Sequence, residues 1–263
     1  MIKDENFVLL ARIDDLCRRA DRGEITVSCF LTPKEKRVVL RHLASKGMMG
    51  RCLMYGGYAE AERCRAYMLP DYISDADDFD DIEPYMEKKD IVALRILGSG
   101  YRRLTHRDYL GSILGLGIER EVIGDIVFED TEDESAIIFC DAVIADFLLC
   151  ELKKIANDTV KVKKAEISQD FVPKREFAHI SDTVASARID SVVAALCSLS
   201  REKAAAAVNS GIVEVDYEVE TRQDRFVAPP CIVSVRGYGK FRINSVSEQT
   251  RRGRFRLSAD RYI

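Results

Sequence analysis

Arginine and lysine side chains near predicted helix starts and strands are the residues of this chain best suited to chemistry, and that chemistry is phosphate binding. Ser200 and Arg201 stand where a helix is predicted to begin, so a cation lies beside backbone N–H groups that lack a helical acceptor. Such a helix start can hold an anion through its N–H groups and the guanidinium together. Lys203 follows in the same turn, and Arg236 ends a predicted strand. We therefore expect a phosphate-binding surface in the last third of the chain.

The segment that follows Arg236 extends this surface. Residues 222–263 contain ten Lys and Arg against three Asp and Glu, a net charge of +7, with aromatic residues among them. This composition suits phosphate contact combined with base stacking. Two alternatives stay open: Arg188 and Asp190 could form an ion pair within the domain, and the tail could be a solvated strand edge. The candidate RNA-binding residues are Arg188, Asp190, Ser200, Arg201, Lys203, Arg236, Lys240, Arg242, Arg251, Arg252, Arg254 and Arg256.

The charge of the whole chain points the other way. Its net charge is −4, which does not suit a general nucleic-acid binder. Residues 71–90, however, carry nine Asp and Glu against two Lys, so much of the acidic charge is concentrated there. Charge that is separated by segment allows a local polyanion site on an acidic protein.

Patterns for catalysis are weak in this sequence. His106, Arg107 and Asp108 are adjacent on a predicted helix, so their side chains diverge and cannot converge on one substrate. A structural role in the first helical turn, or contact with RNA or the ribosome, is favoured for Thr105, His106 and Arg107. His42 and His179 are isolated in the sequence. We predict no catalytic residue.

Signals for cofactors, metals and membranes are also weak. Glycines in 98–100 and 111–117 lack the Gly-Lys-Ser/Thr ending of a P-loop and the spacing of a dinucleotide-binding loop. The eight cysteines form no Cys-x-x-Cys pair, which favours reduced thiols over a zinc site or disulfides. Residues 1–10 do not resemble an export signal, and no apolar run is long enough to span a membrane. We expect a cytoplasmic protein with no cofactor, metal, membrane partner or small-molecule substrate.

Helical periodicity dominates the first part of the chain. Apolar residues in 7–17 recur at three- and four-residue steps, which predicts a helix with one apolar face. Thr32 is placed to cap a second helix. A short helix is expected over 59–65. We expect a small α/β domain at 1–74, and the acidic residues that follow predict a linker or domain edge.

The next domain is expected at 75–170. Strand-like and helical segments follow one another there in the order βαββαβ. This order matches a ferredoxin-like sandwich, the architecture of RNA-recognition motifs. Phe128 and Phe139 are the best candidates for stacking bases on the central strands, and we expect no typical stacking platform.

A third domain is expected at 181–263. Two short helices are predicted, one from Ala187 to Leu196 and one that begins after Ser200 and ends before Gly211. The period then changes to two, which predicts a strand in 212–219 and a partner in 232–235. The overall expectation is an α+β protein of three small domains.

The third domain resembles the S4 RNA-binding domain. The resemblance rests on Arg188-Ile-Asp190, Ser200-Arg201 followed by Ala204, Gly211-Ile-Val-Glu-Val215 and Ile232-Val-Ser-Val-Arg-Gly237. It implies two helices packed on a small sheet, with a convex basic surface that grips structured RNA. The sequence departs from the usual pattern at Asp216-Tyr217 and at Cys231, where turn-forming residues are customary.

Further motifs resemble the YlmH family of bacterial S4-domain proteins. They are Gly56-Gly57-Tyr58 with Glu62-Arg63, the segment Leu104 to Gly111, Gly115-Leu-Gly117, Ile123-Gly124-Asp125-Ile126 and Arg236-Gly-Tyr-Gly-Lys-Phe241. The resemblance implies a non-catalytic protein that binds rRNA and tRNA on the large ribosomal subunit, obstructed by peptidyl-tRNA, in ribosome quality control. Two alternatives are an RNA-modifying enzyme similar to pseudouridine synthases and a protein-interaction adaptor. The sequence does not identify the RNA element, the stage of ribosome processing, protein partners, the oligomeric state, or the roles of the N-terminal domain and of 71–90.

Overall fold

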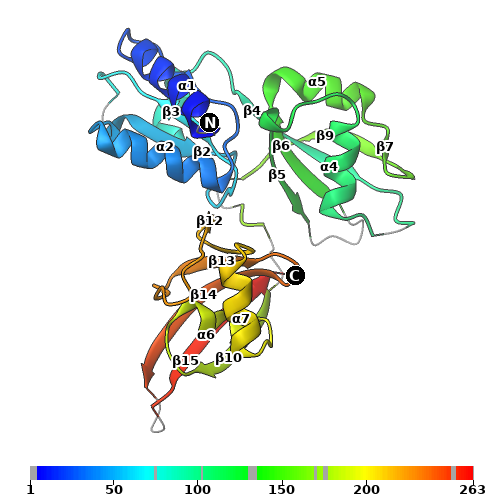
Figure 1. Cartoon of the computed structure of the whole chain (residues 1–263). Coiled ribbons are helices and arrows are strands. Elements are labelled where there is room, and N and C mark those ends of the chain that lie inside the picture. The colour runs from blue at the N-terminus through cyan, green and yellow to red at the C-terminus, as the bar shows by residue number, and fades with distance from the viewer. Residues whose placement is uncertain are drawn as a thin grey trace. The chain divides into compact units, whose positions relative to one another are not determined.

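The computed structural model describes residues 5–73, 76–101, 103–129, 135–168, 171–173, 177–249 and 253–262. The chain is a mixed α and β protein that forms two compact units, residues 1–174 and 175–263 (Figure 1). Each unit has apolar core clusters of its own. The division into domains at 1–74, 75–170 and 181–263 stays a prediction.

The first unit begins with two helices packed on a three-stranded antiparallel sheet of order β1-β3-β2. Its core includes Ile13, Val39, Leu43 and Met68. Thr32 caps the second helix in a reciprocal capping box with Glu35, which confirms the predicted helix start. The elements are α1 (Glu5–Ala20), β1 (Thr26–Val27), α2 (Pro33–Ser45), the 3₁₀ turn η1 (Met49–Arg51), β2 (Cys52–Tyr55) and β3 (Arg65–Met68).

The short helix expected in this region is wrong, and so is a bare linker over the acidic residues, whereas a domain edge there stays a prediction. The short helix expected over 59–65 is absent from the described residues there, and β3 begins instead at Arg65 as the buried central strand of the sheet. The acidic stretch is not a bare linker. It contains α3 (Phe79–Ile82) and the 3₁₀ turn η2 (Glu83–Tyr85), and fully buried Ile82 packs with Tyr67 of β3. Apolar residues between the acids therefore bind this stretch to the sheet.

A four-stranded antiparallel sheet of order β5-β6-β4-β9 follows in the same unit. Two helices cover one of its faces, and the elements succeed one another as βαββαβ, as the sequence predicts. After the last helix, Ala156 (φ 50°) and Asn157 form a two-residue turn between β7 and β8. The elements are β4 (Ile91–Leu97), α4 (His106–Leu114), the 3₁₀ turn η3 (Arg120–Val122), β5 (Ile123–Phe128), β6 (Ala136–Asp141), α5 (Ala142–Glu151), β7 (Lys154–Ile155), β8 (Asp158–Thr159) and β9 (Lys161–Ala165).

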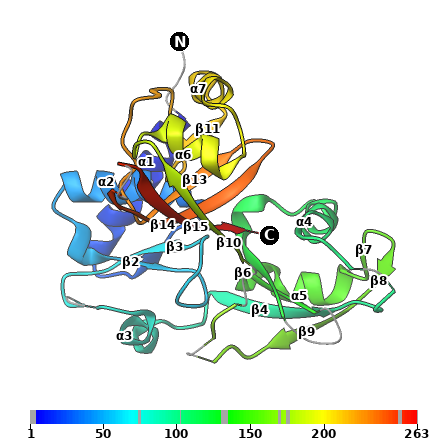
Figure 2. The same ribbon diagram turned by 90° about the horizontal axis from the view of Figure 1, so that it is seen from below.

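The second unit contains a six-stranded antiparallel sheet of order β10-β15-β14-β13-β11-β12. Its two helices lie on the same face of this sheet, where Val193, Leu196 and Ala204 pack against Val233 and Phe241 (Figures 1 and 2). The elements are β10 (Phe177–Val184), α6 (Ile189–Leu196), α7 (Arg201–Asn209), β11 (Val213–Val215), β12 (Glu218–Val219), β13 (Cys231–Val235), β14 (Gly239–Gln249) and β15 (Phe255–Tyr262).

Candidate RNA interface

The start of α7 brings together three of the predicted residues. The Asp190 side chain is 6% exposed. Its Oδ2 lies 3.0 Å from Nη2 of Arg201, and its Oδ1 lies 3.4 Å from Nε of Arg188. The intradomain ion pair left open for Arg188 and Asp190 is therefore present. One carboxylate faces two guanidinium groups, so this helix-start cluster of Arg188, Asp190 and Arg201 keeps an excess of positive charge. The buried carboxylate also fixes Arg201 beside the first turn of α7.

The cap of α7 is the predicted one. The Ser200 hydroxyl accepts a hydrogen bond from the Lys203 backbone N–H at 3.3 Å, and the other N–H groups of the first turn have no acceptor within the helix. Lys203 and Arg236 both have exposed side chains. Arg236 directly follows β13, and its backbone N–H donates to the carbonyl of Ile212 at 2.9 Å, before β11. A half-exposed Arg201 and a capped helix start together form a local cationic site that suits a phosphate.

The tail cations lie on the opposite side of the sheet from the helices. Phe241 and Leu257 point into the core under α6 and α7, so the alternating Lys240, Arg242 and Arg256 point the other way. We call this side the outer sheet face and define it by Phe177, His179, Ser181, Lys240, Arg242, Asn244, Arg256, Ser258, Asp260 and Tyr262. The sequence-based prediction joined the cations in one surface, whereas the structure places Lys240, Arg242 and Arg256 on the side of the sheet opposite the helix-start cluster.

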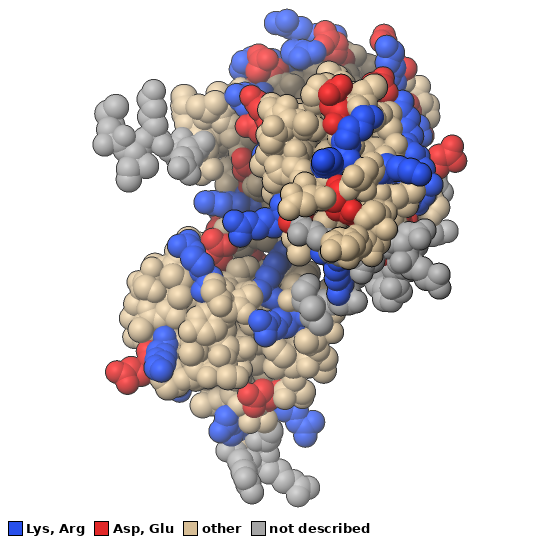
Figure 3. All heavy atoms as spheres, turned by 90° about the vertical axis from the view of Figure 1, so that its right-hand side faces the viewer, with Lys and Arg blue, Asp and Glu red and all other residues tan. Residues whose placement is uncertain are grey.

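Interior strands, and not a solvated edge, carry this tail. β14 lies between β13 and β15, and β15 lies between β14 and β10. Arg254 donates from Nη2 to the carbonyl of Thr183 at 2.5 Å. Arg251 and Arg252 lie outside the described residues. On the side of the second unit visible in Figure 3, Lys and Arg side chains are more frequent than Asp and Glu.

Asp260 organises the outer sheet face. Its Oδ1 is 2.9 Å from His179 Nδ1, and its Oδ2 accepts from Arg242 Nη2 at 2.9 Å and Asn244 Nδ2 at 2.8 Å. Hydrogen bonds from His179, Asn244 and Arg242 hold the pKa of Asp260 well below its ordinary value of 3.8. The carboxylate is therefore charged at neutral pH and fixes the position of Arg242.

In the first unit, Thr105, His106 and Arg107 lie at the start of α4. Thr105 and Asp108 form a reciprocal capping box, so Thr105 has the structural role that its position predicts. His106 and Arg107 have exposed side chains. Desolvation and then the nearby Arg120 cation lower the pKa of His106 from its ordinary 6.5, so the ring is neutral at pH 7. Arg107 is thus the cation that this helix start contributes.

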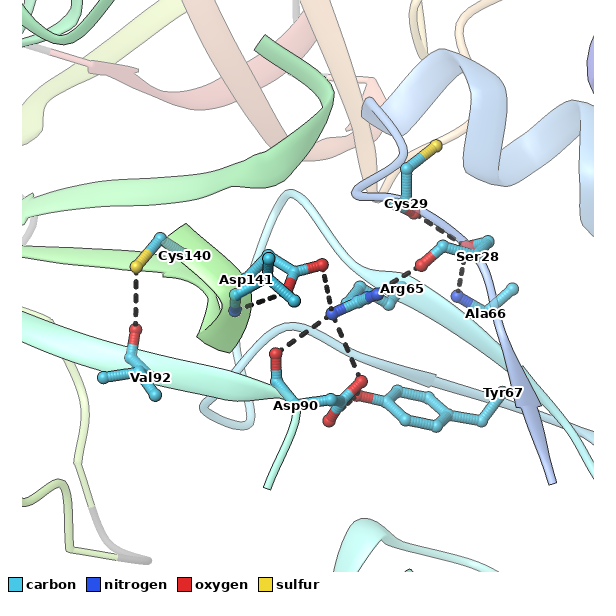
Figure 4. Close-up of polar contacts among 10 residues, drawn as sticks. Ser28, Cys29, Arg65, Ala66, Tyr67, Asp90, Val92, Cys140 and Asp141 are labelled. Carbon is cyan, nitrogen blue, oxygen red and sulfur yellow. Dashed lines mark hydrogen bonds and ion pairs between the residues drawn. The ribbon is translucent and has the colours of Figure 1, made fainter. Parts of the chain in front are cut away.

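Sequence reasoning missed the buried arginine of β3. The Arg65 side chain is 7% exposed, and its Nη1 lies 3.3 Å from Asp90 Oδ2 and 3.1 Å from Asp141 Oδ2 (Figure 4). Its Nε donates to the carbonyl of Ser28 at 2.7 Å. Burial raises the pKa of Asp90 above its ordinary value, although the Arg65 cation acts in the opposite direction. Arg65 therefore joins the three-stranded sheet β1-β3-β2 to β4 and β6 of the four-stranded sheet.

The family motifs of the first unit lie at the same junction. Asp125 of β5 accepts three hydrogen bonds, from the Tyr58 hydroxyl at 2.7 Å and from the backbone N–H groups of Glu62 at 2.7 Å and Arg63 at 3.1 Å. Arg63 donates in turn to the carbonyls of Phe30, Arg120 and Ile123. The motif residues thus connect the two sheets. In the sequence, the signal that could have pointed to this junction was the spacing of Gly56-Gly57-Tyr58 and Glu62-Arg63.

This junction covers one face of the second sheet. Tyr58, Ala61 and Cys64 pack against Ile137 and Phe139 on the side opposite α4 and α5. Phe139 is 1% exposed, since Tyr58 packs against it in a tilted arrangement with ring centroids 4.9 Å apart. Phe128 faces the helices and contacts Tyr109. Neither candidate ring is placed to stack a base on an open strand face.

Other titratable groups have structural partners. His42 bonds Asp14 at 2.6 Å and His179 bonds Asp260, so the two histidines are isolated in sequence and paired in the fold. All eight cysteines are free thiols. Within the described ranges no three His, Cys, Asp or Glu side chains gather in a metal-binding arrangement. Over the same residues, no helix combines the length and the apolar character that crossing a membrane requires.

Comparisons with known proteins agree with the resemblance found in the sequence. Residues 92–169 match a family model described as "Putative RNA-binding domain in YlmH". The chain is 28% identical over 232 residues to the "Ribosome-associated protein quality control protein P2" of Bacillus subtilis (strain 168), a match that spans 88% of this chain and 85% of that protein. A solved structure, "Cell division protein ylmH from Streptococcus pneumoniae", is 24% identical with a TM-score of 0.48, over 63% of this chain and 94% of that chain. The family model and the Bacillus relative confirm that this chain resembles the YlmH family.

Proposed function

We propose that the protein is a non-catalytic RNA-binding protein of ribosome-associated quality control. It binds rRNA and tRNA on the large ribosomal subunit that holds a peptidyl-tRNA, and it acts in the cytoplasm. The second unit serves as an S4-type domain, and β4 to β9 form an RNA-recognition-like sandwich. The observation that carries the proposal is the helix-start cluster, in which buried Asp190 holds Arg201 beside the first turn of α7.

Chemistry and similarity support this proposal from two directions. Cations at a helix start bind a phosphate backbone without reading its bases, which suits folded RNA. The name of the Bacillus relative states that it is ribosome-associated and acts in protein quality control, and the match spans most of both chains. In the first unit the strand face is covered, so α4 with Arg107 is the part of that sandwich proposed to contact the ribosome or RNA.

Sedimentation with purified large subunits tests the proposal. The protein is expected to pellet with the subunits at low salt and to stay in the supernatant at high salt, because counterion release drives phosphate binding. Arg201→Ala and Arg236→Ala should each weaken binding and reduce the salt slope by about one unit or less. Arg188 remains beside Asp190 in Arg201→Ala, so the fold is retained.

A matched control is Arg18→Ala, which removes an exposed arginine from a surface pair with Asp15 in α1. It should leave both affinity and salt slope unchanged. If the two test variants bind with the wild-type slope, the helix start of α7 is not the RNA contact. If the wild-type protein shows no salt-sensitive binding to subunits, rRNA or tRNA, the proposed function is wrong.

A further inference from the structure

Aromatic rings and cations alternate along the outer sheet face. Phe177 and Tyr262 are direct partners across β10 and β15, with ring centroids 5.0 Å apart. Lys240 Nζ lies 4.7 Å from the Tyr262 ring, and the Arg242 guanidinium carbon lies 4.6 Å from the Phe177 ring. The strand pairing therefore places two half-buried rings and two cations side by side on one face of the sheet.

A third ring reaches this row from the turn between β11 and β12. The Tyr217 ring lies 5.2 Å from Lys240 Nζ, so that the ammonium stands between two tyrosines. Asp216 (φ 50°) and Tyr217 (φ 67°) both adopt the left-handed conformation of a two-residue hairpin turn. Asn-Gly or Asp-Gly is the usual pair in such a turn, since glycine has no side chain to oppose positive φ. A tyrosine kept in a position that suits glycine points to a use for its ring.

The charge of this surface favours a polyanion. Lys240, Arg242 and Arg256 contribute cations to it, and Asp260, the acidic residue among those that define this face, is buried and already bonded to Arg242, His179 and Asn244. Rings of tyrosine and phenylalanine stack on nucleobases, and lysine and arginine contact the adjoining phosphates. A duplex hides its bases inside the helix, so such rings select nucleotides that are unpaired.

We propose that the outer sheet face is a second RNA-binding surface, which takes an unpaired RNA segment by stacking bases on Tyr217, Tyr262 and Phe177. Lys240 and Arg242 hold its phosphates. The helix-start cluster on the other side of the same unit takes the backbone of folded RNA. One unit thus binds two RNA segments of different kinds. This inference rests on the proposed RNA-binding function and deepens it, because it assigns a substrate class to each face.

Fluorescence anisotropy with two labelled probes tests it. One probe is a single-stranded oligouridylate of about ten nucleotides, and the other is a blunt RNA duplex of similar length. Tyr217→Gly removes the ring from a turn that glycine suits, so the fold is retained. We expect it to weaken oligouridylate binding by about tenfold while duplex binding changes by less than about twofold. Lys240→Gln should weaken the same probe and lower its salt slope by about 0.7.

The matched control is Arg201→Ala, expected to weaken the duplex and to spare the oligouridylate. Oligouridylate affinity that is unchanged in both Tyr217→Gly and Lys240→Gln overturns the inference, as does an equal loss for the two probes. So does a variant that keeps both RNA affinities and loses only its association with large subunits, because the outer sheet face would then contact protein. If neither probe binds the wild-type protein, the proposed function itself fails.

Discussion

Asp260 shows how one acidic residue can support a cationic surface. It is buried among His179, Arg242 and Asn244, so its charge is neutralised locally while it fixes the side chains that bind anions. Deleting this carboxylate would release Arg242 as well as remove a negative charge. Removing the Asp260 carboxylate should therefore lower the free energy of unfolding more than removing an exposed carboxylate would.

The pH dependence of folding follows from the lowered pKa of Asp260. Above its ordinary value of 3.8 the carboxylate is charged in the folded and unfolded chain, and the native hydrogen bonds stabilise the fold. As the pH falls below that value the unfolded chain takes up a proton first, so this stabilisation is lost. The free energy of unfolding of Asp260→Asn should therefore lie below that of the wild type at pH 6 and approach it near pH 3. Urea titrations followed by circular dichroism measure this difference, and a constant gap between pH 6 and pH 3 would contradict it.

At the residue scale the sequence predicts local roles and misses distant ones. Thr32, Thr105 and Ser200 cap helices as expected, because a cap depends on residues two or three positions away. Arg65 could not be predicted as buried, since its partners Asp90 and Asp141 come from later strands. A charged residue is buried when partners are present, and partners that far along the chain leave no periodic signal.

At the scale of elements, glycine positions determine how closely the two sheets of the first unit approach. A Cβ on Gly124 of β5 would lie 2.7 Å from Cε1 of Phe30, which is 1% exposed. Gly124→Ala should therefore lower the free energy of unfolding by about 1–3 kcal/mol, the usual cost of overpacking. Gly111 of α4 is the matched control, because a Cβ there has nothing within 4 Å. Gly111→Ala should stabilise the protein by about 0.5–1 kcal/mol. Chemical denaturation of both variants decides the matter, and equal stabilities would contradict this role of Gly124.

Prediction of elements succeeded where periodicity is strong. The βαββαβ order was visible because each segment has a regular apolar pattern, and α6 and α7 were visible from their spacing and caps. β10 and β15 were missed. The residues that these strands contribute to the outer sheet face, such as His179 and Ser258, are polar. The two strands also lie near opposite ends of the sequence of this unit, so no local pattern indicates their pairing. The placement of Lys240 and Arg242 opposite the helices followed from the burial of Phe241 between them in β14, a strand that the sequence did not predict.

For the whole molecule, separate cores predict separate unfolding. Each core cluster of the described residues belongs to one unit, with Val193 and Phe241 in the second and Ile138 and Phe139 in the first. Calorimetry should therefore resolve two transitions. Gly124→Ala should lower the midpoint of one by about 2–8 °C and leave the other unchanged. A single transition that shifts as a whole would show that the units unfold together.

The antiparallel pairing of β10 with β15 has an evolutionary consequence. Phe177 and Tyr262 are neighbours across these strands, so the polypeptide enters and leaves the second unit at nearly the same point. A segment with adjacent ends can be grafted onto unrelated hosts, or circularly permuted, with little disturbance of its interior. Recombination can thus transfer this unit to another protein together with both of its proposed RNA-binding faces.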